Sequence, residues 1–151
     1  MKHDEEFNMM LVPHAGVSAA MGKLFKKPGA AFAAGVAVHA LMDLTPHKDI
    51  SAHKAEGLAV LLMLGLVGSS CGWSSPPFWC AIGGVLPDFE QVLPWTDPKR
   101  GKHRWFPTHN PYFHSLRLPN ARQWRAPLLL QSAVSVAALG AAVARCKKTS
   151  L

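Results

Sequence analysis

The chain has 151 residues, of which 49% are hydrophobic and 17% charged, so we expect a single domain over residues 1–151 with a large apolar interior. The charged fraction is low for a soluble domain, where about a quarter is usual. Sixteen Lys and Arg against nine Asp and Glu give a net charge of +7, which suits an anionic lipid surface. No basic and aromatic recognition motif accompanies this charge, which argues against a nucleic-acid partner.

The cysteines predict neither a disulfide framework nor a thiolate zinc site. Cys71, Cys80 and Cys146 show no CxxC spacing and leave an odd count. We expect them to be small apolar residues near helix ends. The acidic start of the chain differs from the basic start of a signal peptide, so we also expect no cleavable targeting segment.

Five apolar segments, separated by turn sequences such as Lys-Lys-Pro-Gly and Ser-Ser-Pro-Pro, predict five helices. In chain order they cover residues 9–25, 29–44, 57–73, 78–87 and 126–144. The last is flanked by Arg and Lys and fits a membrane-spanning helix, which needs about 20 residues. Residues 88–125 are rich in Pro, Trp and Arg and predict an ordered loop region with little helix. The predicted fold class is therefore all-α, a membrane-embedded bundle of about four to five apolar helices. We expect an integral membrane protein, in the inner or plasma membrane if the source is bacterial.

Helices that alternate in direction would gather the metal-capable side chains at one face of the bundle. That face would hold all nine acidic residues, whereas the opposite face would hold six Lys or Arg and no acid. The metal-capable residues there are His14, Asp43, His47, Asp88, Glu90, His109 and His114, with His39 one helical turn deeper. Because both faces carry basic residues, the positive-inside rule leaves the orientation open.

The first motif is His39-Ala-Leu-Met-Asp43, followed closely by Pro46 and His47. In a helix, His39 and Asp43 stand at positions i and i+4 on one face, close enough to bind one cation. Pro46 ends the helix, which places His47 in the following turn. An imidazole and a carboxylate are costly to bury among Ala, Val and Leu unless something pairs them. A metal ion is the simplest such partner.

Two further motifs add oxygen and nitrogen donors. The sequence Leu-Pro-Asp88-Phe-Glu90 ends an apolar helix with two carboxylates, which hard or borderline cations accept as ligands. An acidic turn in which Asp88 caps a following helix is the alternative for this motif. His109 and His114 stand five residues apart in a loop that contains Pro.

These motifs resemble those of the membrane-bound (inner-membrane) metal-dependent hydrolase family. The resemblance rests on an N-terminal histidine, a Leu-Pro-Asp-x-Asp motif and a closing His-Arg-Gly-x-Thr-His-Ser motif. The matching residues are His14, Asp88, His109, His114 and Ser115, while Glu90 replaces the second aspartate of the family motif and Asn110, Pro111 and Phe113 depart from the closing one. Separately, His39-x3-Asp43-x2-Pro46-His47 is similar to a motif of zinc-dependent phospholipase C, which has one further residue between Pro and His.

The resemblance implies a hydrolase that holds a divalent metal ion, zinc in view of the His-rich shell. The implied ligands are His14, His39, Asp43, Asp88, His109 and His114. The ion would lower the pKa of a bound water, and the resulting hydroxide would attack an ester or phosphodiester, with a membrane lipid as a candidate substrate. Glu90 or His47 would act as general base or would orient a ligand, and Lys102 and Arg117 would attract an anionic headgroup.

Two other interpretations compete with the hydrolase. In the first, the chain is a non-enzymatic integral membrane protein in which His39 and Asp43 only form hydrogen bonds within the bundle. In the second, it is a soluble helical domain, and residues 126–144 form a buried core helix. The sequence sets neither the substrate, the number of metal ions nor the oligomeric state.

Overall fold

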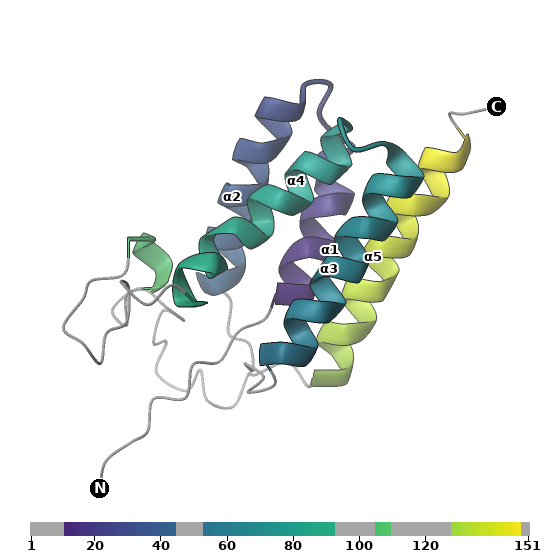
Figure 1. Ribbon diagram of the computed structural model, residues 1–151. Helices are drawn as coiled ribbons and strands as arrows, with labels where there is room; N and C mark the ends of the chain where they lie inside the picture. The colour runs from purple at the N-terminus through teal and green to yellow at the C-terminus, as the bar shows by residue number, and fades with distance from the viewer. Residues whose placement is uncertain (1–10, 45–52, 93–104, 110–127, 149–151) are drawn as a thin grey trace, which may run out of the picture.

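The computed structural model describes residues 11–44, 53–92, 105–109 and 128–148. These parts of the chain contain helices and no strand, which confirms the predicted all-α class (Figure 1). The elements are α1 Leu11–Gly22, α2 Pro28–Leu44, α3 His53–Cys71, α4 Pro76–Val85, the 3-10 helices η1 Leu86–Val92 and η4 Pro107–His109, and α5 Leu128–Lys148.

Turn residues set the boundaries of the helices at one end of the bundle. Pro28 begins α2, where its missing N–H costs no hydrogen bond. The hydroxyl of Ser75 accepts a hydrogen bond from the backbone N–H of Phe78 at 3.3 Å and so caps α4. Gly72, directly after α3, has a φ of 95°, a left-handed conformation that favours glycine and ends the helix.

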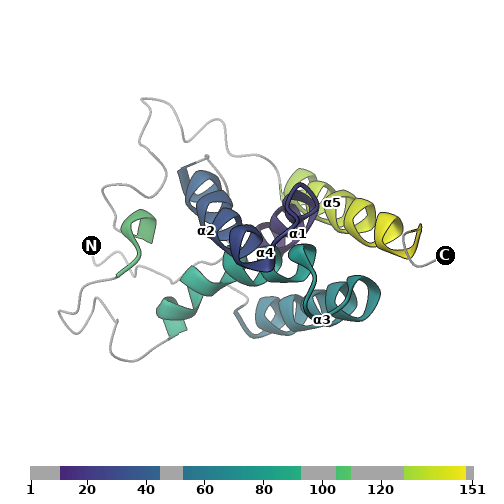
Figure 2. The same cartoon turned by 90° about the horizontal axis from the view of Figure 1, so that it is seen from above.

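Helix α1 lies at the centre of the bundle and contacts each of the other four helices (Figures 1 and 2). Helix α2 packs closely on α4 because glycines stand where the two backbones meet. A Cβ atom on Gly35 of α2 would collide with the carbonyl oxygen of Cys80 on α4, and one on Gly83 would collide with the carbonyl oxygen of Phe32. This close approach brings the C-terminal ends of α2 and α4 together.

The predicted helices are all present, with boundaries shifted by a few residues. The segment predicted over 126–144 is found as α5, which runs on to Lys148 and so includes the basic residues after the apolar stretch. Among the described residues, no helix combines the length and the apolar character needed to cross a membrane. The predicted spanning role of residues 126–144 is therefore not supported. Within the predicted loop region 88–125, the described residues form the 3-10 helices η1 and η4, and the remainder lies outside the described residues.

The prediction for the cysteines was wrong for two of the three. Cys71 at the end of α3 and Cys146 near the end of α5 form a disulfide, with their Cα atoms 5.0 Å apart. They are separated by 75 residues in the sequence, so only the packing of α3 beside α5 brings them together. Cys80 is a free thiol buried in the core, as predicted for a small apolar residue.

The contact between α2 and α4 gives a first prediction. Gly35→Ala should lower the free energy of unfolding by about 1–3 kcal/mol, because the added methyl group overlaps a backbone carbonyl that cannot move freely. Gly65→Ala in α3 is the matched control, since a Cβ there meets nothing within 4 Å. It should raise the stability by about 0.5–1 kcal/mol. Urea denaturation followed by circular dichroism measures both; equal effects of the two variants would contradict the close approach.

Candidate metal centre

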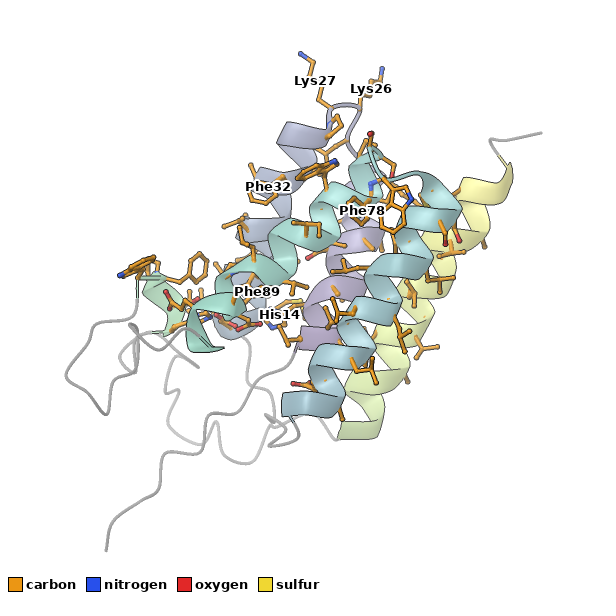
Figure 3. The ribbon with its side chains drawn as sticks, in the orientation of Figure 1. His14, Lys26, Lys27, Phe32, Phe78 and Phe89 are labelled. Atoms are coloured by element: carbon orange, nitrogen blue, oxygen red, sulfur yellow. A yellow bond between two sulfur atoms is a disulfide. The ribbon has the colours of Figure 1, made fainter. Side chains whose placement is uncertain are left out.

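Six potential metal ligands or ligand partners come together where α2 and α4 end, beside the start of α1, where Figure 3 labels His14. They are His14 of α1, His39 and Asp43 of α2, Asp88 and Glu90 of η1, and His109 of η4. Each is at most 7% exposed. The C-terminal end of a helix carries partial negative charge, so the position suits a cation.

The packing of α2 explains why His39 and Asp43 face this site. The buried residues of α2 follow a four-residue spacing, Ala31, Gly35, His39 and Asp43. The first two are small and face neighbouring helices, and the last two continue the same stripe to the end of the helix. The predicted i, i+4 pair is confirmed, with His39 Nε2 at 3.2 Å from Asp43 Oδ2.

Three donor atoms lie at distances that suit a single metal ion. His39 Nε2 is 3.1 Å from His109 Nε2 and 3.2 Å from Asp43 Oδ2, and His109 Nε2 is 3.6 Å from Asp43 Oδ2. A tetrahedral zinc ion with bonds of about 2.0–2.1 Å requires its donor atoms to be about 3.3–3.4 Å apart. The donor set is therefore two imidazole nitrogens and one carboxylate oxygen, and Asp88 Oδ1 lies beside it, 3.3 Å from His109 Nε2.

The hydrogen bonds around the site fix which nitrogens face the ion. His39 Nδ1 lies 2.8 Å from the carbonyl oxygen of Gly84, and His109 Nδ1 lies 2.8 Å from Glu90 Oε1. Both acceptors require a donor, so in the neutral rings the proton is on Nδ1 and the lone pair is on Nε2. The two Nε2 lone pairs then face each other across 3.1 Å. This arrangement is repulsive unless a metal ion or a proton lies between them.

The carboxylate ligand Asp43 and the ligand His109 also have outer partners, as is usual at metal sites. The hydroxyl of Thr108 donates to Asp43 Oδ2 at 2.5 Å. Glu90 Oε2 accepts the backbone N–H groups of Trp105 and Phe106, at 2.8 and 2.9 Å. Both oxygens of Glu90 are thus engaged, so the geometry favours its predicted role of orienting a ligand over that of a general base.

His14 lies against two of these donor residues. Its Nδ1 is 2.7 Å from His39 Nδ1, and its Nε2 is 3.7 Å from Asp43 Oδ1. Two groups of donors are close enough to hold an ion: His14 with His39 and Asp88, and His39 with Asp43 and His109. The first group would use His39 Nδ1, which already faces the Gly84 carbonyl. We therefore favour the second group.

In the metal-free site, neighbouring side chains shift the pKa values of Asp43 and His109. Burial alone would raise the pKa of Asp43, but the hydrogen bond and charge of His39, with smaller effects from His14 and Thr108, hold it well below its usual range. Burial alone would lower the pKa of His109, but the hydrogen bond and charge of Asp88, followed by Glu90 and Asp43, raise it. The carboxylates around His109 therefore favour positive charge at this position, from a proton or from a metal ion.

The structure brings together His14, His39, Asp43, Asp88, Glu90 and His109, as the sequence predicted. Asp88 lies in the first turn of η1, and its side chain is buried beside His109; the alternative in which it caps a helix stays a prediction. Four other predicted residues, His47, Lys102, His114 and Arg117, lie outside the described residues. Sequence reasoning missed Thr108, although its position next to His109 is a usable signal, and Gly84, whose backbone carbonyl leaves no signal in the sequence.

Comparisons with known proteins found no matching family model, no matching curated protein and no matching solved structure. The resemblance to hydrolase motifs therefore stays a prediction.

The raised pKa of His109 gives a prediction for the metal-free protein. Protonated His109 is stabilised by Asp88 and Glu90, so its contribution to stability is complete below its ordinary pKa of about 6.5 and is lost as the pH rises through the raised value. In chelator, the melting temperature should therefore fall as the pH rises over this range. His109→Asn should remove this part of the pH dependence. A fall of the same size in both proteins would contradict the assignment.

Proposed function

We propose that this chain is a membrane-bound metal-dependent hydrolase that uses a zinc-type ion to activate water against an ester or phosphodiester. One observation carries the proposal: the Nε2 atoms of His39 and His109 lie 3.1 Å apart in a buried site, and Asp43 Oδ2 lies close enough to both to share one ion with them. Mixed nitrogen and oxygen donors suit zinc better than magnesium or calcium, which prefer oxygen alone.

Different residues of the chain would have different roles in such a site. His39, Asp43 and His109 would hold the ion, which would lower the pKa of a bound water towards neutrality. Glu90 keeps Nε2 of His109 directed at the other two donors, and the Gly84 carbonyl does the same for His39. Catalysis requires room for water in the fourth position of the ion.

A structural metal site is the second candidate. It is favoured by the burial of the donors and of His14 and Asp88 beside them, because structural zinc sites are closed whereas catalytic ones keep an open position. The two candidates predict the same metal content. They differ in whether the loaded protein hydrolyses a substrate.

Exposed apolar side chains support the proposed membrane attachment. On α3, Leu58, Leu61, Leu62 and Leu66 form one exposed face at helical spacing. Other exposed large apolar residues belong to α2, α4, η1 and α5, namely Leu41, Trp79, Leu86, Phe89, Val134 and Val136. Because α2, α3 and α5 lie on different sides of the bundle (Figure 2), a single protein partner would cover one face only. Lipid acyl chains would contact all of them.

The metal site gives a direct prediction. The purified 151-residue chain, loaded with zinc and desalted, should retain one ion, and His39→Ala or His109→Ala should lose it because each removes one of the three donors. Glu90→Gln should weaken zinc affinity about 10- to 100-fold. Ser69→Ala, at an exposed position of α3, is the control and should bind as the wild type does. Metal content is measured by atomic absorption.

Hydrolysis of a nitrophenyl ester and of a nitrophenyl phosphodiester by the same preparations separates the two candidates. Activity that is lost in chelator and restored by zinc supports the hydrolase. Stoichiometric zinc without hydrolysis of either probe supports the structural site. Wild-type protein without bound zinc, or unchanged binding in the His39 and His109 variants, contradicts both.

Membrane attachment gives a separate prediction. Replacing both Leu61 and Leu62 with Gln should weaken partition of the full chain into phosphatidylcholine vesicles by about tenfold or more for each leucine. Ser69→Gln, on the same helix and also exposed, should leave the partition unchanged. Flotation of the vesicles measures the bound fraction. Wild-type protein that remains with the buffer would contradict the attachment.

A further inference from the structure

The end of the bundle opposite the metal centre exposes aromatic, apolar and basic side chains together. It is formed by residues 23–27, between α1 and α2, and by residues 72–75, between α3 and α4 (Figure 1). Leu24 is 74% exposed and Trp73 is 60% exposed. Lys26 and Lys27 project away from the bundle, and His14 lies at the other end (Figure 3).

The exposed tryptophans belong to a packed aromatic cluster. The ring centroid of Trp73 lies 5.2 Å from that of Phe78, and Trp79 lies 6.1 Å from Phe78 and 6.4 Å from Phe32. All three contacts are edge-to-face, a favourable geometry that holds the rings in place. The outer faces of Trp73 and Trp79 are thereby fixed in an exposed position.

The charge at this end is of one sign. In the described part of the chain, the acidic residues are Asp43, Glu56, Asp88 and Glu90, which lie in the last turn of α2, the first turn of α3 and η1. None belongs to the two loops at the opposite end. The disulfide between Cys71 and Cys146 brings the last turn of α5, with the sequence Arg-Cys-Lys-Lys, to the same end.

We propose that this end binds the anionic phospholipid headgroups of a bilayer through Lys26 and Lys27, with Trp73, Trp79 and Leu24 entering the interface. Tryptophan prefers this level of a membrane, and each lysine near an anionic surface adds attraction. The phosphates of a nucleic acid would pair with the charges of the lysines but would leave Leu24 and the tryptophans exposed to water. The proposal rests on the membrane attachment proposed above and names the lipid class that the attachment prefers.

The surface around Lys26 and Lys27 lies far from the metal centre and therefore from any substrate site there. Asp43 lies fifteen residues beyond Pro28 on α2, which corresponds to about 22 Å along the helix. Headgroups bound at Lys26 and Lys27 are therefore out of reach of the metal ligands. The surface anchors and orients the protein rather than presenting a substrate.

Vesicle flotation of the full chain tests the proposal. Phosphatidylcholine vesicles are compared with vesicles that also contain phosphatidylglycerol. The wild type should prefer the anionic vesicles, and Lys26→Gln/Lys27→Gln should reduce binding to them about thirtyfold, at about fivefold for each lysine. Binding to pure phosphatidylcholine should not change. Lys54→Gln, in the first turn of α3, is the matched control for the loss caused by each lysine.

A second measurement locates the tryptophans. Brominated phosphatidylglycerol should quench the fluorescence of the wild type, and Trp73→Phe/Trp79→Phe should lose much of this quenching while retaining zinc. Equal binding to both vesicle types, or an equal loss for each lysine in the two lysine variants, would overturn the headgroup proposal and leave membrane attachment standing. Absence of binding to any vesicle would overturn both. Retention of a DNA duplex through Lys26 and Lys27, without a preference among vesicles, would assign the surface to nucleic acid instead.

Discussion

The arrangement of this protein depends on one close contact, between Nε2 of His39 and Nε2 of His109 at 3.1 Å. The Nδ1–H group of His39 donates to the Gly84 carbonyl, and the Nδ1–H group of His109 donates to Glu90. The Nε2 lone pairs of the two rings therefore point at the same place. Two lone pairs that face each other in a buried site repel, and a cation between the rings would relieve this repulsion. Asp88, Glu90 and Asp43 raise the pKa of His109, and a divalent ion would be stabilised by the same carboxylates.

The two rings belong to segments that are far apart in sequence, and the fold brings these segments together. Glycines on α2 and α4 allow the two backbones to touch, which sets His39 beside the Gly84 carbonyl. Glu90 then binds the backbone at Trp105 and Phe106 and holds His109 in position. Packing, backbone geometry and metal chemistry are therefore coupled: a residue at the contact between α2 and α4 influences the site without touching an ion.

Much of this site could be predicted from the sequence because its signals are local. The spacing of His39 and Asp43 places them on one helical face, and the run from Asp88 to Glu90 marks the end of an apolar helix. The roles within the site could not be predicted. Which nitrogen faces the ion depends on the Gly84 carbonyl, and the position of His14 depends on the packing of α1. The disulfide between Cys71 and Cys146 was missed for the same reason, since it links positions 75 residues apart.

X-ray absorption spectroscopy of the zinc-loaded protein tests the central claim most directly, because it reports the donor atoms around the ion. The account predicts two imidazole nitrogens and oxygen donors in the first shell, at about 2.0–2.2 Å, with the multiple-scattering signal of two histidine rings. Glu90→Gln should weaken or disorder the contribution of one ring, that of His109. A first shell that contains sulfur, or oxygen without imidazole, would contradict the account.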